Sequence, residues 1–137
     1  MLKKTIKYTD YNGKEREEDF YFGVNKAELT EMEYSEEGGF DKYLTKILKE
    51  ENAKEIMNTV KRFILKSYGE KSEDGKRFVK SEELSLGFAQ TEAYSELFIE
   101  ICSNPDKATE FILGILPDSI REEIKKEIEK TSNKIDA

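Results

Sequence analysis

The sequence predicts an α+β fold that is mostly α, with an N-terminal β-hairpin followed by about five to seven helices packed as one domain. Three observations support this prediction. The stretch TIKYTDYNGKEREEDFYF alternates apolar and polar residues about a turn signal, which is the period of a strand. Most of the remaining chain repeats apolar residues three or four positions apart, which is the period of a helix. A length of 137 residues suits one domain with a real core.

The hairpin prediction includes a register. Asp10 and Gly13 suit a type I turn closed by a left-handed glycine, so the strands close on Asp10 and Lys14. Leu2 then faces Phe22 across the strands. One face carries four apolar side chains: Ile6, Tyr8, Phe20 and Phe22. Because two strands alone are marginal in water, we expect this face to be buried against helices or a second subunit.

Capping signals predict the first helices. Asn25 and Glu28 form a capping box, and the helix that they open should end near Tyr34. Apolar residues then recur at helical spacing from Phe40 to Leu48. A second capping box, Asn52 with Glu55, opens the longest helical pattern of the chain.

The polar stretch that follows this helix contains a glycine–lysine pair. It is not a phosphate-binding loop, because five residues separate Gly69 from Gly75 where four are needed, and Arg77 stands where Ser or Thr must be. It is a poor calcium loop too, since Ser81 stands where a bidentate Glu belongs. We therefore predict that Gly69 caps the preceding helix and that residues 70–76 form a solvated turn.

Three further helices are predicted in the second half. Ser81 starts a helix that breaks or bends near Gln90, and Pro105 opens the next one with Ser103 or Asn104 as its cap. Pro117 restarts the chain into a highly charged segment. We expect residues 1–117 to hold the hairpin (3–22) and the helical part (25–116). Residues 118–137 should add a charged helix or tail to the same domain.

The composition argues against catalysis and against several binding classes. The chain has one cysteine, so an intramolecular disulfide is impossible. It has no histidine, so only a lysine or a carboxylate could act as the base that activates Ser or Cys. Cys102 follows Phe98, Ile99 and Ile101 and is expected to be a small buried core residue. We expect no enzyme activity, no cofactor and no metal. With no signal peptide or membrane span evident, we expect the protein to work in a reducing cytoplasm and not at a membrane.

The charge distribution suggests a protein-binding surface. The net charge is −7, and no Lys or Arg occurs from Ser81 to Pro105, although Glu92, Glu96 and Glu100 do. A nucleic-acid binder would carry the opposite sign. The stretch is either a solvated acidic face or a surface that receives a basic partner.

A narrow apolar stripe marks the C-terminal segment. Its apolar residues Ile120, Ile124 and Ile128 lie four positions apart on an otherwise charged pattern. Such a stripe is too thin to hold the helix in a monomer's core, so we expect the segment either to dock on another chain, which we favour, or to fray in isolation.

Several of these stretches together resemble the tail assembly chaperones of long-tailed phages and prophages of Gram-positive bacteria. The resemblance rests on the hairpin with DYNGKEREE, on NKAELTEME and on YGEKSEDGKRFVKSEELSLGFAQTEAY, and it runs from about Leu2 to Pro117. It implies that residues 1–117 are the chaperone domain. The segment 118–137 matches less clearly.

The resemblance also implies a function. Such a chaperone coats the long, aggregation-prone tape measure protein before the tail tube polymerises around it, and it helps to recruit tail tube protein. It acts in the host bacterial cytoplasm, is absent from the mature virion, and is expected to form a homo-oligomer. Many members are made in two lengths by a translational frameshift, and this chain would be the short form.

A second interpretation stays open at this stage. A small acidic adaptor or regulatory module that binds one folded protein partner would show the same composition and the same absence of catalytic residues.

Overall fold

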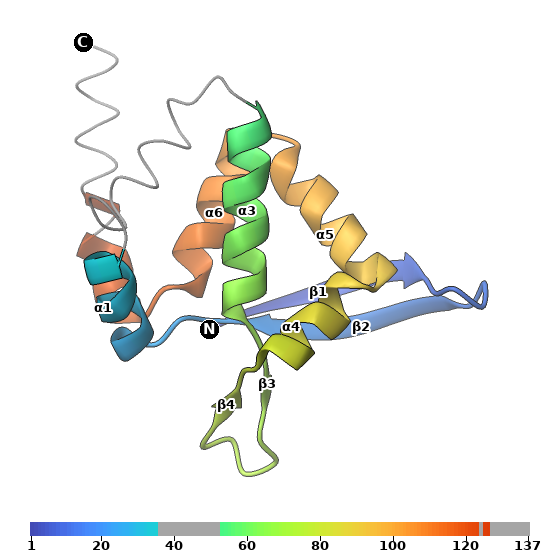
Figure 1. The fold of residues 1–137 in the computed structure, drawn as a ribbon, viewed down its shortest axis with the longest axis horizontal. Helices are drawn as coiled ribbons and strands as arrows, with labels where there is room; N and C mark the ends of the chain where they lie inside the picture. Colours follow the sequence, from blue (N-terminus) through green and yellow to red (C-terminus); the bar gives the residue numbers. More distant parts are fainter. Residues whose placement is uncertain (36–52, 124, 127–137) are drawn as a thin grey trace.

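A computed structural model of the chain describes residues 1–35, 53–123, 125 and 126 (Figure 1). The strands are β1 (Leu2–Thr9), β2 (Glu15–Phe22), β3 (Tyr68–Lys71) and β4 (Phe78–Val79). The helices with both ends described are α1 (Lys26–Ser35), α3 (Ala53–Ser67), α4 (Glu82–Ala89), α5 (Glu92–Cys102) and α6 (Pro105–Ile115). The predicted fold class, an N-terminal hairpin followed by packed helices, is confirmed. The helical pattern from Phe40 to Leu48 and the cap at Asn52 lie outside the described residues.

The hairpin has the predicted turn and register. Leu2 pairs with Phe22 and Thr9 with Glu15, without interruption between them. The Asp10 N–H donates to the Lys14 carbonyl (2.8 Å), and the Gly13 N–H donates to the Asp10 carbonyl (3.0 Å). Gly13 has φ +82°, the left-handed conformation that the turn requires and that glycine adopts without strain.

The side chain of Asp10 organises this turn. Its carboxylate accepts hydrogen bonds from the backbone N–H groups of Asn12 and Lys14, and from the Nε of Arg16 at 2.7 Å. The Arg16 hydrogen bond, followed by the one from Lys14, holds the pKa of Asp10 below its ordinary value. The turn that sets the register is therefore fixed by a charged side chain as well as by the backbone.

The sheet contains two strands that the sequence analysis did not predict. The strand order is β1-β2-β3-β4, and β3 pairs with the end of β2 through Tyr21 with Gly69 and Phe22 with Tyr68. The prediction that Gly69 caps a helix is wrong, because α3 ends at Ser67 and Gly69 lies within β3. A Cβ at Gly69 would lie 2.9 Å from the Phe78 ring and from the Val79 carbonyl oxygen, so glycine is needed for the close approach of β4.

The link between β3 and β4, residues 72–77, is a solvated turn as predicted, but Glu70 and Lys71, which the prediction placed in the turn, belong to β3. The Ser72 N–H donates to the Arg77 carbonyl, and Gly75 has φ +73°. Asp74 accepts hydrogen bonds from the Ser72 hydroxyl and from the Lys76 N–H. The β3–β4 arm projects away from helices α3 and α6 (Figure 1).

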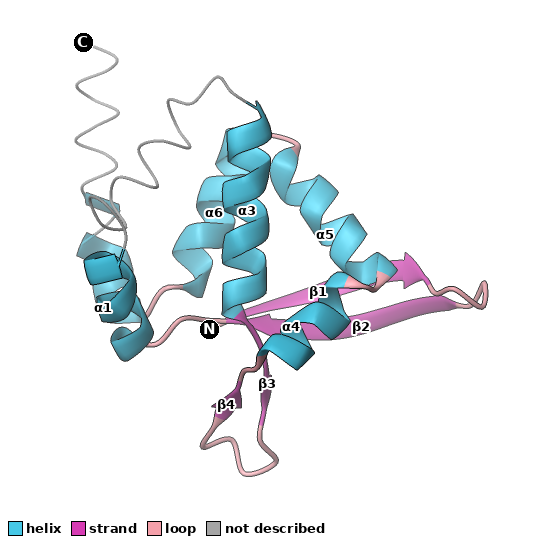
Figure 2. Ribbon diagram, viewed as in Figure 1, coloured by secondary structure: helices cyan, strands magenta, loops and turns pink. Residues whose placement is uncertain are grey.

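The core lies between one face of the hairpin and the helices, of which α3, α5 and α6 stand on the same side of the strands (Figure 2). Phe22 has no exposed surface, and its ring lies 5.4–5.8 Å from those of Tyr68, Phe88 and Phe111. Ile6 is also buried, while Tyr8 and Phe20 are half-buried and pack against the core. The prediction that this hairpin face packs on helices is confirmed.

The capping signals are also confirmed where the structure describes them. Asn25 and Glu28 exchange hydrogen bonds between side chain and backbone, as a capping box requires. Ser81, Thr91 and Asn104 cap α4, α5 and α6. Thr91 marks the break that was predicted near Gln90.

Removing the central aromatic ring of the core should be costly. Phe22→Ala should lower the free energy of unfolding by about 3–5 kcal/mol, the usual range for a fully buried phenylalanine. Phe20→Ala should cost less, because Phe20 is only half-buried. Urea denaturation followed by circular dichroism measures both. Equal losses for the two variants would contradict the packing described here.

Two glycines offer a matched test of the arm. Gly69→Ala should destabilise the protein by roughly 1–3 kcal/mol, because the new Cβ meets the Phe78 ring and the Val79 backbone. Gly87→Ala, with nothing within 4 Å of the new Cβ and a place inside α4, should stabilise it by about 0.5–1 kcal/mol. Thermal unfolding of the two variants gives the comparison. A neutral Gly69→Ala would mean that β4 does not lie against β3.

Candidate partner-binding surface

Helix α5 lies over β1, and two of the three predicted glutamates hold it there. The Nζ of Lys4 lies 3.2 Å from an Oε of Glu100. At the other end of α5, the hydroxyl of Tyr11 donates to Glu92 (3.1 Å) and to the Gln90 carbonyl (3.2 Å). Glu92 and Glu100 therefore tie α5 to the hairpin. They are less available to a partner than their sequence pattern indicated.

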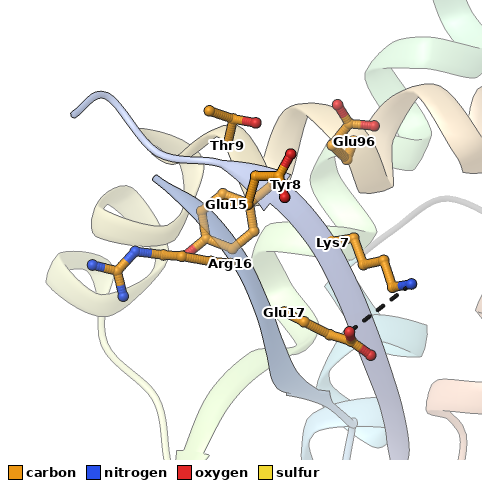
Figure 3. Close-up of a pocket in the computed structure, with 7 residues that line it drawn as sticks. All are labelled: Lys7, Tyr8, Thr9, Glu15, Arg16, Glu17 and Glu96. Atoms are coloured by element: carbon orange, nitrogen blue, oxygen red, sulfur yellow. Dashed lines mark ion pairs between the residues drawn. The ribbon is translucent and has the colours of Figure 1, made fainter. Parts of the chain in front are cut away.

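Glu96 differs from these two glutamates. It is exposed, and no Lys or Arg of the described residues forms an ion pair with it. It reaches from α5 over an open hollow of about 530 Å³, whose other walls come from the hairpin (Figure 3). The hairpin residues of this hollow are Lys7, Tyr8, Thr9, Glu15, Arg16 and Glu17.

The floor of this hollow is a network of charged and polar side chains. Arg16 lies 2.7 Å from Asp10 and 3.3 Å from Glu18, and the Tyr8 hydroxyl donates to Glu18. The hydrogen bond to Glu18 raises the pKa of the Tyr8 phenol above its ordinary value. Lys7, by contrast, is 81% exposed and lies 4.0 Å from Glu17, so it makes only a weak ion pair.

A second, smaller hollow of about 110 Å³ continues along β1 toward its N-terminal end. Leu2 and Lys4 of β1 line it, together with residues of α5 and α6 that include Glu100, Lys107 and Phe111. The two hollows therefore follow the same strand beneath the same helix layer. Sequence reasoning missed the part played by β1. Its lysines at positions 3, 4 and 7 were the signal that could have drawn attention to it.

The isoleucine stripe is only partly described. Ile120 is half-buried and packs against the chain's own core. The adjacent Arg121 donates to the carbonyls of Leu113 and Leu116 at 2.9 Å, which closes the end of α6. Ile124 and Ile128 lie outside the described residues, so the docking role of the stripe stays a prediction.

Chemistry at Cys102 is limited by its surroundings. The thiol is half-buried against the core, and this burial raises its pKa. Cys102 packs against the core, as the sequence predicted, but it is half-buried where full burial was expected. Within the described ranges no three His, Cys, Asp or Glu side chains gather as metal ligands would. In the same residues no helix has the length and hydropathy to cross a membrane.

No curated protein and no solved structure matches the chain. The family described as phage tail assembly chaperone matches it over residues 1–137, which includes the segment after Pro117 where the resemblance in the sequence was weaker. A match of this extent shows the family: the chain belongs to the phage tail assembly chaperones.

Proposed function

We propose that the protein is a non-enzymatic chaperone that binds the tape measure protein and helps to recruit tail tube protein during tail morphogenesis. The observation that carries this proposal is the family match over the whole chain. The protein would act in the host bacterial cytoplasm as a homo-oligomer and would be absent from the mature virion. It would keep an elongated, aggregation-prone partner soluble until the tube forms around it.

The described surface supports a role in protein binding. The segment from α4 to α5 carries no Lys or Arg, and it exposes the apolar side chains of Leu86 (59%) and Ile99 (65%) beside acidic ones. Exposed leucine and isoleucine next to glutamates suit a partner that is basic and amphipathic. Glu92, Glu96 and Glu100 would contribute the electrostatic part of this binding. Ile120, Ile124 and Ile128 would contribute apolar docking, with Ile120 shared with the core.

Co-expression tests the proposal directly. A tape measure fragment produced alone should precipitate, and the same fragment produced with this chain should stay soluble and co-purify with it at a defined ratio. The Phe22→Ala variant, which keeps the charge of the chain but should be less stable, is a control for non-specific effects of co-expression. A tape measure fragment that stays insoluble and does not co-purify would contradict the proposed function.

Neutralising the three glutamates should weaken capture of the fragment at low salt. Glu92→Gln, Glu96→Gln and Glu100→Gln together remove three negative charges while keeping hydrogen-bonding capacity. The loss in affinity should be large at 0.1 M salt, where the screening length is about 10 Å, and should fade at 1 M, where it is about 3 Å. Titration of labelled fragment at both salt concentrations measures it.

A matched control keeps the charge change and moves it elsewhere. Glu31, Glu70 and Glu73 are exposed and lie on α1, on β3 and on the β3–β4 turn. Their replacement by Gln should leave the affinity close to that of the unchanged protein. If both triple variants lose affinity equally, net charge and not the surface on α5 is responsible.

A further inference from the structure

The outer edge of β1 is open in the part of the chain that the structure describes. The strand order places β1 at the end of the sheet, with β2 on one side and no described strand on the other. Asp10 and Lys14 form a hydrogen-bonded pair, and bonded and non-bonded pairs alternate along an antiparallel ladder. The backbone groups that point away from β2 therefore belong to alternate residues of the strand: Lys3, Thr5, Lys7 and Thr9.

This edge is protected by lysines but by neither a proline nor a bulge. Its eight residues contain no proline, and the register with β2 runs without a bulge. The two hollows described above border β1, one at Leu2 and Lys4 beneath α5 and α6 and the other at residues 7–9 near Glu96. An extended segment could enter there and continue the sheet, which is a common mode of peptide recognition.

The charges around the edge specify the chemistry of such a segment. Lys3 and Lys7 lie on the outer face of the strand, whereas Glu96 of α5 overhangs its inner face without an ion-pair partner among the described residues (Figure 3). Because strand side chains alternate between faces, one segment can present acidic residues to the lysines and basic or apolar residues to Glu96.

The existing partner of β1 shows that this pattern fits. On the outer face of β2, Glu17 pairs with Lys7 and Asp19 with Thr5, while Arg16 and Phe20 lie on the inner face. β2 thus places acidic residues opposite Thr5 and Lys7 on the outer face. Its inner face carries Arg16 and Phe20, together with Glu18, which bonds to Tyr8 and Arg16.

We propose that the open edge of β1 binds an extended segment of a partner protein as an added strand, with acidic side chains on its outer face and basic or apolar side chains on its inner face. A second copy of β1 is a poorer occupant. Its outer face carries Lys3, Thr5, Lys7 and Thr9, so a second copy would offer no acidic side chain to the lysines. Only the identity of the protein that supplies the segment rests on the proposed function.

A pair of peptides of equal composition tests the proposal with the full-length chain. EKTIEKTV carries Glu and Thr on one face and Lys, Ile and Val on the other, and KETIKETV has Glu and Lys exchanged. In an NMR titration to millimolar concentration, EKTIEKTV should shift the backbone amides of Lys3, Thr5, Lys7 and Thr9. KETIKETV should bind roughly fivefold or more weakly. With its apolar residues on the inner face its charges are reversed, and with its charges correctly placed Ile and Val lie on the outer face.

Two variants at one position separate edge pairing from general attraction. Thr5→Pro removes an outward N–H that takes no part in the β1–β2 ladder, whereas Thr5→Ala keeps this N–H and loses the same side-chain hydrogen bond to Asp19. Thr5→Pro should bind EKTIEKTV about tenfold more weakly than Thr5→Ala does. Should Thr5→Pro fail to fold, Glu96→Lys takes its place, and it should remove the preference for EKTIEKTV over KETIKETV.

The outcomes that would overturn the proposal are specific. The first is the absence of shifts at the four outward amides at millimolar peptide. The second is equal binding of the peptide by the two Thr5 variants. The third is the appearance of shifts when the protein is concentrated alone, which would indicate that two copies pair. None of these experiments contains a tail protein. Failure of tape measure capture with intact peptide binding would therefore count against the proposed function and leave the strand-binding site standing.

Discussion

The structure depends on covering one face of the N-terminal hairpin. Two strands cannot hold an apolar face in water, and here Phe22 lies at the centre of an aromatic cluster contributed by β3, α4 and α6. The elements of the second half of the chain are thereby fixed relative to residues near the N-terminus. The turn at Asp10 matters for the same reason, because a slip of one residue would move every apolar side chain to the solvent face.

This arrangement leaves the hairpin asymmetric. Its inner face is sealed by helices, its β2 side is joined by β3, and its β1 side is open in the described residues. Helix α5 sits over the open side and is tied there by Lys4 with Glu100 and by Tyr11 with Glu92. The strand-binding site proposed above would suit a partner that is bound and later released. Main-chain hydrogen bonds give an edge general affinity, and a few surface charges adjust its selectivity.

Local sequence signals predicted the elements that local physics determines. The hairpin register followed from the turn residues at Asp10 and Gly13, and the helix starts followed from Asn25, Ser81 and Asn104. The β3–β4 arm was missed because its pairing is non-local: two residues of β3 meet β2 across nearly fifty positions of sequence, and Gly69 suits a helix cap as well as a close approach. Non-local contacts also explain why the candidate site was predicted only in part. The absence of Lys and Arg singled out Glu92, Glu96 and Glu100, but only the fold shows that Lys4 and Tyr11 hold two of them and leave Glu96 beside an open strand.

Hydrogen exchange along β1 in the isolated protein tests the central claim, which is that the helices seal the hairpin's inner face and leave its outer edge open. The amides of Lys4, Ile6 and Tyr8 donate into the ladder and should be protected, whereas those of Thr5 and Lys7 point outward and should exchange far faster. An alternation of this kind along one strand is the result that the account predicts. Protection of Thr5 and Lys7 equal to that of Ile6 would mean that the edge is already covered, and it would contradict the account.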